Sequence, residues 1–451
     1  MSYLEEMNSF LSGRALPVLL IGVGIFFAVR LRLFYFLHPI KFAKDLISAG
    51  KGSGTSPFKA LTVALAGTLG VGNISGVATA ISAGGAGAVF WMWLSALAAM
   101  GVKYAEVYLA VRYRKTRIKN GKSEHYGGAP YYIRDALYLH IGKKAACVLS
   151  VAFSLLLVTN SLITGNIVQV NAASSVFEKV PPLAIGAFFA VLLCIVVSGG
   201  AKRVGDFAVG VIPVLSVVYL VLSLYIIFSN AAQIPAVFKA IFREAFGFRA
   251  AAGGVVGYGM MRAVRFGVTR GIFSNEAGCG TAPTAHAAAD TRSPHHQGCF
   301  GVFEVFCDTV VLCTVTALVI LLSKVEGKDA IPLAVASYGV FAGRGAEIFI
   351  SVSVVIFALA TVICQSYYGV EALFFVSDKK RMQVVYIILA AVCAVVGSVI
   401  SVSLMWQIAD LQIAVMTIIN TLAVFILSDE ILPPYRKDKK EKSLKKREPR
   451  T

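Results

Sequence analysis

Charged residues are scarce in this chain. Of its 451 residues only 15% are Asp, Glu, Lys or Arg, whereas 57% are hydrophobic. A soluble domain usually carries about 25% charged residues, so the composition excludes an ordinary soluble protein. About eleven apolar segments of roughly 20 residues recur along the chain, and each is long enough to cross a hydrocarbon core as a helix. The sequence therefore predicts an all-α polytopic membrane protein.

Metal-binding and redox motifs are lacking as well. The eight cysteines form no C-x-x-C pair, and most fall within apolar segments, where a thiol behaves as a small hydrophobic group. Three histidines, His286, His295 and His296, share one loop, but we find no H-E-x-x-H motif and only Asp290 at ligand spacing. We therefore expect no transition-metal site and no organic cofactor.

An enzyme is disfavoured. An intramembrane enzyme would need a nucleophile with a neighbouring base or a metal cluster, and neither is recognisable, so we expect no enzymatic activity.

The first apolar segment does not have the features of a signal peptide. A signal peptide would begin with a Lys/Arg-rich region, whereas this segment follows Glu5 and Glu6 and has no convincing cleavage site. We interpret that segment as a retained helix.

Basic residues account for the net charge of +18, and they alternate with the apolar segments. They cluster after the first, third, fifth, seventh and ninth segments and in the tail "R-K-D-K-K-E-K-S-L-K-K-R". By the positive-inside rule these loops are cytoplasmic, which predicts an outside N-terminus and a cytoplasmic C-terminus in a bacterial or archaeal cytoplasmic membrane. We expect the tail to contact anionic lipid and not nucleic acid.

One apolar segment is interrupted by "G-T-L-G-V-G-N-I-S-G", from Gly67 to Gly76. It is neither a dinucleotide fingerprint nor a phosphate-binding loop, although close helix packing through small residues remains an alternative. Five segments later, "R-G-I-F-S-N-E-A-G-C-G-T-A-P" interrupts a second one. A broken helix persists in a membrane only where it is buried in protein or lines a cavity. Both interruptions therefore indicate a functional site.

The spacing of the two interruptions predicts the architecture. If each opens a five-helix repeat, segments 2 to 6 and 7 to 11 form two repeats of opposite orientation, as in secondary transporters. The first segment is then an addition. This predicts an extra helix with a basic loop over residues 1–57, repeats over 58–230 and 231–432, and a basic tail over 433–451.

Unwinding supplies the chemistry of the expected site. It frees N–H groups that attract a carboxylate and C=O groups that coordinate a cation. Glycine allows the necessary backbone angles and the close approach of a ligand, and Asn73 adds an amide that donates and accepts. An amino acid zwitterion has charges that match both ends of such a site.

These segments carry a family resemblance. "A-L-A-G-T-L-G-V-G-N-I-S-G-V-A-T-A-I", "V-S-G-G-A-K-R", "S-Y-Y-G" and especially "R-G-I-F-S-N-E-A-G-C-G-T-A-P-T-A-H-A-A-A" are similar to the alanine or glycine:cation symporter family. The likeness extends over nearly the whole chain. It implies a LeuT-type fold and a sodium- or proton-coupled importer of small neutral amino acids, for which a monomer suffices.

The departures from the family pattern bear on the substrate. Val71 stands where the family usually has threonine, Val370 intervenes before Glu371, and Cys279 and Thr281 replace a leucine and a serine. Sodium-coupled import of alanine or glycine is the expectation that the resemblance implies. Proton-coupled import of another neutral amino acid such as glutamine is the alternative, and an ion channel is a more distant one because a single pair of dissimilar broken helices supplies no repeated filter.

The resemblance also implies site residues. Substrate contacts are expected at Gly70, Gly72, Asn73, Ser75, Asn166, Gln169, Ser274, Asn275, Gly278 and Gln365. Asn166 and Gln169 lie three residues apart, which favours one helical face, although interhelical hydrogen bonding explains them equally well. Sodium ligands are expected at Ala66, Leu69, Thr361 and Ser366. A hydroxyl bonded to its own helix is the alternative for the last two.

Charged residues inside the apolar segments are costly and therefore candidates for function. Lys103 and Glu106, at i and i+3, are expected to neutralise one another in a structural pair. Glu276 is expected either to form a gate with Arg270 or to have a structural role. Glu304 and Asp308 are expected to share a helical face, with a proton-coupling role as a hypothesis. Asp410 is expected to be an anchoring acceptor.

Overall fold

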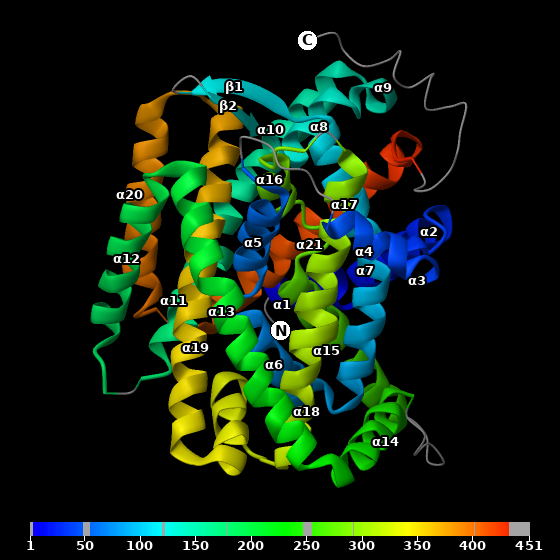
Figure 1. Ribbon diagram of the computed structural model, residues 1–451, viewed down its shortest axis with the longest axis vertical. Coiled ribbons are helices and arrows are strands. Elements are labelled where there is room, and N and C mark those ends of the chain that lie inside the picture. The colour runs from blue at the N-terminus through cyan, green and yellow to red at the C-terminus, as the bar shows by residue number, and fades with distance from the viewer. Residues whose placement is uncertain are drawn as a thin grey trace.

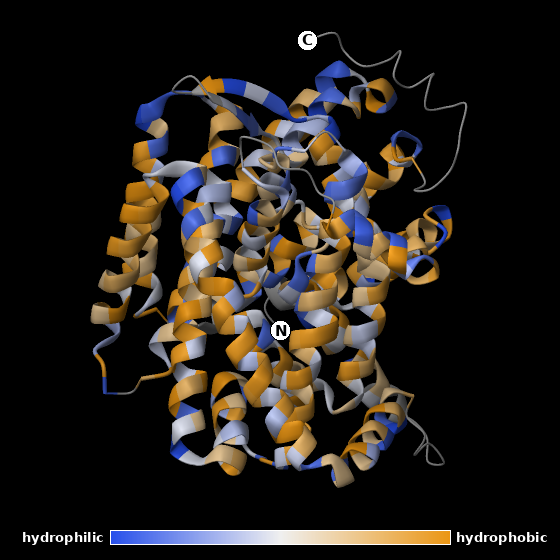
Figure 2. Ribbon diagram, in the orientation of Figure 1, coloured by the Kyte–Doolittle hydropathy of each residue, from blue (hydrophilic) through white to orange (hydrophobic). Residues whose placement is uncertain are grey.

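The computed structural model describes residues 3–47, 55–119, 122–177, 179–246, 255–291, 293–400 and 402–432. Helices run along the long axis of the molecule, as Figure 1 shows. Figure 2 shows that hydrophobic residues cover the middle of the helices and hydrophilic residues gather toward the upper end. The basic tail at 433–451 and Arg292, in the basic loop after the seventh apolar segment, lie outside the described residues.

The N-terminal part packs on the outside of the bundle. It consists of α1 (Tyr3–Phe10), the π-helical turn η1 (Leu11–Ala15), α2 (Leu16–Arg30), α3 (Phe34–Leu37) and α4 (Pro39–Ile47). Helix α2 packs against α7 and α21. This matches the single additional helix that the sequence predicts before the repeats.

The first broken helix opens the next group. Its parts are α5 (Pro57–Thr68), η2 (Val71–Asn73) and α6 (Ser75–Gly84), with a 60° bend between the two halves. The group continues with α7 (Gly87–Arg112), β1 (Lys115–Lys119), β2 (Lys122–Tyr126), α8 (Ala129–Asp135), α9 (Tyr138–Ile141), α10 (Lys143–Leu162), η3 (Ile163–Ile167), α11 (Val168–Ser174), α12 (Pro182–Val197) and α13 (Gly200–Ser229).

The second group repeats this order after the short helices η4 (Ala231–Gln233) and α14 (Ile234–Ala245). It contains α15 (Val255–Asn275), α16 (Pro283–Ala287), α17 (Pro294–Val305), η5 (Phe306–Cys313), α18 (Thr314–Ser323), α19 (Ala330–Val376), α20 (Lys380–Gly397), α21 (Val402–Ile426) and η6 (Leu427–Glu430). Helix α19 turns sharply at Ala342 and Gly343, so its first 12 residues form a separate arm.

In the part of the chain that it describes, the structure has fewer helices of spanning length than the eleven apolar segments of the sequence. Among the described residues eight helices are long and apolar enough to cross a membrane, or nine when the bent pair α5 and α6 is one span. The other two apolar segments correspond to α12, which is apolar but only 16 residues long, and to α15, which carries several arginines.

One end of the molecule collects the basic loops. The hairpin β1–β2, α8, α9 and the start of α20 lie at the upper end in Figure 1, and α14 lies at the other. We call these the basic end and the α14 end. Arg117 fixes the hairpin to α19, because it bonds Glu124 at 3.0 Å and Glu371 at 3.2 Å and stacks over Phe374. Asp135, in α8 at the same end, has a lowered pKa. Burial raises its pKa, but hydrogen bonds from Arg134 and Lys115 outweigh the burial and leave that pKa below its usual value.

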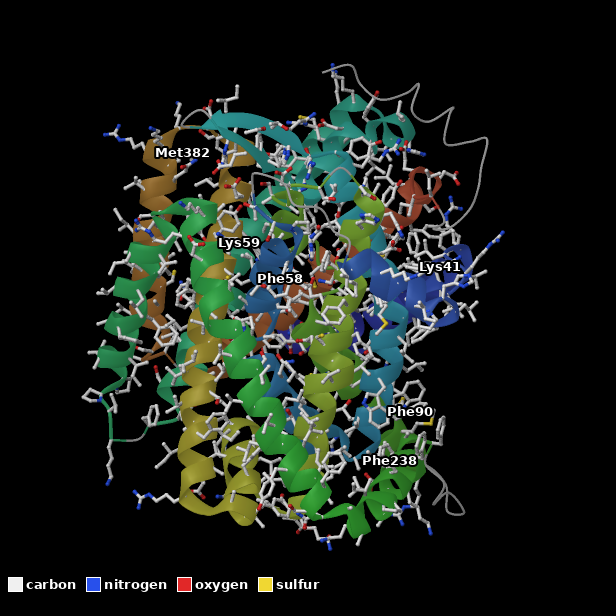
Figure 3. The ribbon with its side chains drawn as sticks, viewed as in Figure 1. Lys41, Phe58, Lys59, Phe90, Phe238 and Met382 are labelled. Carbon is white, nitrogen blue, oxygen red and sulfur yellow. The ribbon has the colours of Figure 1, made fainter. Side chains whose placement is uncertain are left out.

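The two broken helices run antiparallel to each other. Helix α15 packs against α6, and α16 packs against α5. This crossed arrangement is what two repeats of opposite orientation require. On its other side α5 is tied to α13, because the Lys59 ammonium, labelled in Figure 3, lies 2.6 Å from the Asp206 carboxylate.

Candidate functional site

The first unwound segment lies at Leu69 and Gly70, deep in the protein. The helical hydrogen-bond pattern stops after Thr68, and Gly70 takes the irregular angles φ −98° and ψ −146°. A methyl group placed on Gly70 would lie 2.6 Å from both Gln169 Oε1 and Thr361 Oγ1. Gln169 Oε1 instead accepts a hydrogen bond from Val71 N at 3.1 Å. The glycine therefore permits polar side chains from two other helices to reach the unwound backbone.

The second unwound segment follows α15. Its turn contains three positive φ angles, at Glu276 (48°), Gly278 (81°) and Gly280 (77°). The Glu106 carboxylate, from α7, accepts hydrogen bonds from the backbone N–H groups of Gly278 (3.3 Å) and Gly280 (3.2 Å). Asn275 closes the end of α15 by accepting from Ala277 N at 2.9 Å. A buried carboxylate thus satisfies the N–H groups that unwinding exposes.

Asp308 joins the two unwound segments. Asn73 Nδ2 donates to Asp308 Oδ1 at 2.8 Å, and Ser274 Oγ donates to Asp308 Oδ2 at 2.8 Å. A methyl group on Gly72 would lie 3.1 Å from Ser274 Cα, so the two backbones nearly touch here. Thr309 Oγ1 donates to the same carboxylate at 2.7 Å, and Asn275 Nδ2 donates to Thr309 Oγ1 at 3.0 Å. All five side chains are buried.

Helix α19 presents one polar face to α5. Thr361 Oγ1 donates to Ala66 O at 3.0 Å, Gln365 Nε2 lies 3.3 Å from Gly67 O, and Tyr368 Oη donates to Val63 O at 3.1 Å. These residues recur every three or four positions and therefore lie on one side of α19. Ser366 lies one position beyond Gln365, roughly 140° around the helix from Thr361. It is on another face, so the expected cation ligand Ser366 does not join Thr361.

Asn166 and Gln169 diverge, contrary to the expectation of a shared face. Gln169 reaches the break at Val71, whereas Asn166 Nδ2 donates to Ala390 O on α20 at 2.8 Å. The reason is the π-helical turn at Ile163–Ile167, which changes the angular spacing of the residues around it. Asn166 therefore links two helices and does not face the break. Ser75 is buried in the first turn of α6, next to the break.

Arg270 and Glu276 do not pair, so the expected gate between them is wrong. Arg270 forms a two-pronged ion pair with Asp410 on α21, at 3.1 and 3.0 Å, and its guanidinium lies 5.1 Å from the centre of the Trp406 ring. Glu276 accepts from Gln365 Nε2 at 2.8 Å and from Thr281 Oγ1 at 2.5 Å. Arg270 lies within α15 and faces α21, whereas Glu276 lies in the unwound segment that follows and faces α19.

A second correction concerns Glu304 and Asp308. They do not act as a pair, because Asp308 lies in a π-helix over Phe306–Cys313, which turns its side chain to a different face from that of Glu304. Glu304 turns toward Lys103 (3.3 Å) and His286 (3.0 Å), and Asp308 faces the breaks. Lys103 also lies 3.6 Å from Glu106, so the expected pair is part of a larger buried network. Sequence spacing indicates only which residues are neighbours on one helix. It could not predict that Glu304 contacts Lys103 and His286, because those two residues lie on other helices.

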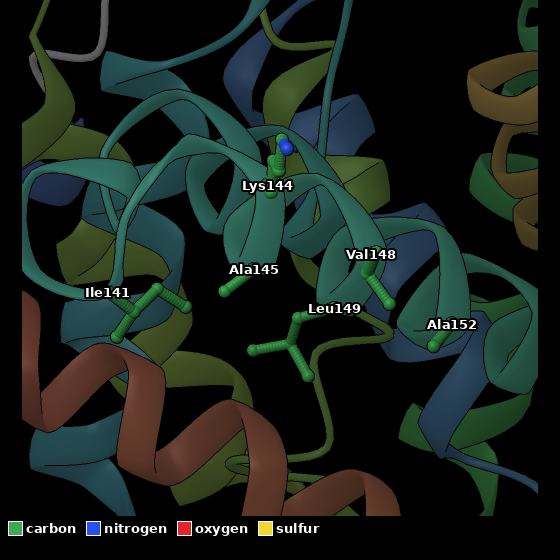
Figure 4. A pocket seen from close by; sticks show the side chains of 6 residues that line it. All are labelled: Ile141, Lys144, Ala145, Val148, Leu149 and Ala152. Carbon is green, nitrogen blue, oxygen red and sulfur yellow. The ribbon is translucent and has the colours of Figure 1, made fainter.

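Figure 4 shows a different feature, an open hollow of about 530 Å³ beside α10. Its lining is Ile141, Lys144, Ala145, Val148, Leu149 and Ala152. Val148 is 70% exposed, so this hollow faces the surroundings of the bundle. It is separate from the unwound segments and offers little polar recognition for a zwitterion.

Comparisons with known proteins agree with this geometry. The model of the "Sodium:alanine symporter family" matches residues 1–450. The chain is 36% identical to the sodium/alanine symporter AgcS of Methanococcus maripaludis, over 96% of this chain and 95% of that protein. It is 38% identical to the uncharacterized transporter YflA of Bacillus subtilis (96% and 92%) and 36% identical to the probable sodium/glutamine symporter GlnT of the same organism (96% and 90%).

The chain belongs to the sodium:alanine symporter family. It is a membrane transporter and not an enzyme. Among solved structures the symporter resembles MhsT in complex with L-phenylalanine, with a TM-score of 0.54 at 14% identity over 84% of this chain and 90% of that one. It also resembles the manganese transporter of Eremococcus coleocola, with a TM-score of 0.54 at 13% identity over 88% and 85%. These likenesses confirm the fold predicted from the two interruptions.

Proposed function

We propose that this symporter imports a small neutral amino acid, alanine or glycine, together with sodium by alternating access. The observation that carries the proposal is the meeting of two unwound segments at Gly72 and Ser274, with hydroxyl, amide and carboxylate oxygens around them. In this arrangement Gln169 and Glu106 accept hydrogen bonds from backbone N–H groups of the unwound segments, and a substrate carboxylate would take the place of one of these acceptors. The oxygen atoms suit a hard cation. The relative AgcS, a sodium/alanine symporter, supports the same substrate and ion.

One proposed sodium position lies between α5 and α19. The carbonyls of Ala66 and Leu69 end the helical part of α5, and the Thr361 hydroxyl already lies 3.0 Å from Ala66 O. A hydroxyl that points at a carbonyl can turn its lone pairs toward a cation that both oxygens share. A sodium ion bound between these oxygens would hold α19 and the end of α5 together, so that ion binding would favour one conformation of the first broken helix.

The Asp308 group is a second proposed cation position. Its carboxylate contacts Asn73 and Ser274, one from each broken helix, and Asn73 Oδ1 is buried without a hydrogen-bond partner among the described residues. A sodium ion would use that oxygen, whereas a proton on Asp308 would serve the proton-coupled alternative.

The substrate itself is proposed to contact Gly70, Gly72, Ser274, Asn275 and Gly278 with Gln169 and Gln365 at the side. The tight surroundings of Gly70 favour a small side chain. Glutamine remains the second candidate, since GlnT is a probable sodium/glutamine symporter of equal similarity.

Two contacts are proposed to close the site on opposite sides. Toward the α14 end, Arg270 and Asp410 join α15 to α21. Toward the basic end, Glu276 joins the second unwound segment to Gln365 on α19. The positive-inside rule makes the basic end cytoplasmic, which places Arg270 on the outer side and gives an outside N-terminus. Alternating release of these contacts would open the site to each side in turn.

Uptake into proteoliposomes tests the proposal. Labelled alanine, glycine and glutamine are offered under an inward sodium gradient, an inward proton gradient or none. We expect sodium-driven accumulation of alanine or glycine, and a raised half-saturating sodium concentration in Thr361→Val. Thr62→Val is the matched control, because its hydroxyl bonds to Phe58 O within α5. Uptake driven by the proton gradient would show that the coupling ion is a proton and not sodium. Accumulation of glutamine alone would show that the substrate is glutamine and not alanine or glycine.

A further inference from the structure

A cluster of metal-binding side chains lies near the basic end, away from the unwound segments. It contains Asp45 from α4 and His295 and Cys299 from α17. His295 Nε2 lies 3.1 Å from Asp45 Oδ2 and 3.8 Å from Cys299 Sγ, and the three ligand atoms lie within 4.8 Å of one another. These residue types are the oxygen, nitrogen and sulfur ligands that Zn²⁺ prefers.

Ligand atoms about 2.0–2.3 Å from a tetrahedral Zn²⁺ lie roughly 3.3–3.6 Å apart. The separation of 3.1 Å between Asp45 Oδ2 and His295 Nε2 is close to that range. Cys299 Sγ lies 3.8 Å from His295 Nε2 and 3.9 Å from Nδ1, beside the ring, so the thiol has to rotate toward Nε2 to bind the same ion. Three protein ligands leave the fourth position to water, and Asp45 and His295 retain 18% and 22% side-chain exposure, so an ion can reach them from solvent.

Supporting hydrogen bonds are already in place. Tyr104 Oη, on α7, lies 2.8 Å from His295 Nδ1 and so leaves Nε2 for the metal. His296 Nε2 lies 3.6 Å from Asp45 Oδ1, the carboxylate oxygen that faces away from His295. Partners of this kind orient the ligands of most protein metal sites. A simple ion pair between Asp45 and His295 would not require Cys299, which is fully buried beside it.

We propose that Asp45, His295 and Cys299 bind Zn²⁺ and thereby fasten the amphipathic helix α4 to α17. The two elements are in contact, as Figure 1 shows. The metal would join residues 250 positions apart in the chain. It would stabilise this packing of the N-terminal part against the bundle, since a ligand that binds only the folded arrangement stabilises it.

A Zn²⁺ site at these residues differs from the expectation of no transition-metal site that was drawn from the sequence. That expectation overlooked Cys299, which follows His295 by four positions and so lies on the same face of α17. The sequence contained this signal. Asp45, in contrast, could be found only from the fold, because nothing in its surroundings connects it with residue 295.

Cobalt substitution tests the site directly in the tag-free, full-length protein. We expect one Co²⁺ per chain, with a thiolate-to-cobalt absorption band that Zn²⁺ abolishes by displacement. The band should vanish in Cys299→Ser and persist in the control Cys393→Ser, whose thiol lies on α20. Zn²⁺ affinity, measured by chelator competition, should fall at least about 100-fold in Asp45→Asn.

Hydrogen exchange tests the link between α4 and α17. With Zn²⁺ the amides of residues 40–47 in α4 should exchange more slowly in the wild type and not in Cys299→Ser. A wild-type protein without the cobalt band would overturn the proposal regardless of how the variants fold. So would Zn²⁺ binding that survives Cys299→Ser unchanged, or unaltered exchange in α4 at saturating Zn²⁺.

Discussion

Replacement of Gly70 by alanine should reduce transport by about one to three orders of magnitude. The added methyl group would lie 2.6 Å from Gln169 Oε1 and Thr361 Oγ1, closer than such atoms normally approach. The backbone angles of Gly70, φ −98° and ψ −146°, lie outside the main helical and extended regions, which disfavours alanine in addition to this clash. The perturbation is therefore steric and is directed at the two polar side chains that contact the break.

The magnitude follows from what must move. Forcing an extra methyl group into a packed site costs about 1–3 kcal/mol. Displacing Gln169 also removes its hydrogen bond to Val71 N, which contributes about 0.5–1.5 kcal/mol. Together these give about 1.5–4.5 kcal/mol, which corresponds to roughly a 10- to 1000-fold loss in uptake efficiency at about 1.4 kcal/mol per tenfold.

The assay compares Gly70→Ala with Gly76→Ala in proteoliposomes. Gly76 lies in α6, six residues further on, and a methyl group there would meet no atom within 4 Å. Alanine has a higher helix propensity than glycine, so Gly76→Ala should transport normally and melt at an equal or higher temperature. Both variants carry the same chemical change, and only their surroundings differ.

Two results would refute this reasoning. The first is normal uptake by Gly70→Ala, which would mean that the break does not lie against Gln169 and Thr361 during transport. The second is an equal loss in both variants, which would mean that added bulk anywhere in the broken helix is harmful. A loss of folded protein in Gly70→Ala alone would be visible in the elution profile and would be separated from the uptake defect.

Three other changes test neighbouring parts of the protein. Lys103→Met removes the cation from buried carboxylates, so its unfolding free energy should fall by about 3–5 kcal/mol, and thermal melting should show a smaller loss when Glu304→Gln is added. A double-mutant cycle of Arg270→Gln and Asp410→Asn in uptake should give a coupling of about 0.5–3 kcal/mol, and additivity would exclude their ion pair from the mechanism. Asp308→Asn should raise the half-saturating sodium concentration at least tenfold (about 1.4 kcal/mol), and an unchanged value would exclude its carboxylate as a ligand.

Composition and periodicity determined the class of the protein and the positions of its apolar segments. Apolar segments of spanning length can satisfy their backbone groups only as helices in a membrane, so their existence could be predicted without a fold. The interruptions at Gly70 and after Asn275 could be predicted for the same reason, because polar and glycine-rich stretches are costly in that setting. Their spacing then determined the two repeats of opposite orientation.

Partners between distant helices could not be predicted in this way. The sequence suggested Arg270 with Glu276 and Glu304 with Asp308, because each pair is close in the chain. The structure pairs Arg270 with Asp410 and directs Asp308 to Asn73 and Ser274. Ion pairs depend on distances of a few ångströms in space, and helix packing sets those distances.

Local helix geometry decided the remaining differences. The π-helical turns at Ile163–Ile167 and Phe306–Cys313 shift the faces on which Asn166 and Asp308 lie, and a regular 3.6-residue period cannot anticipate them. The sequence by itself thus determined which segments enter the membrane and which of them break, because those choices depend on the solvation of each segment alone. Only the tertiary structure decided which side chains meet, because that depends on how the helices rotate and pack against one another.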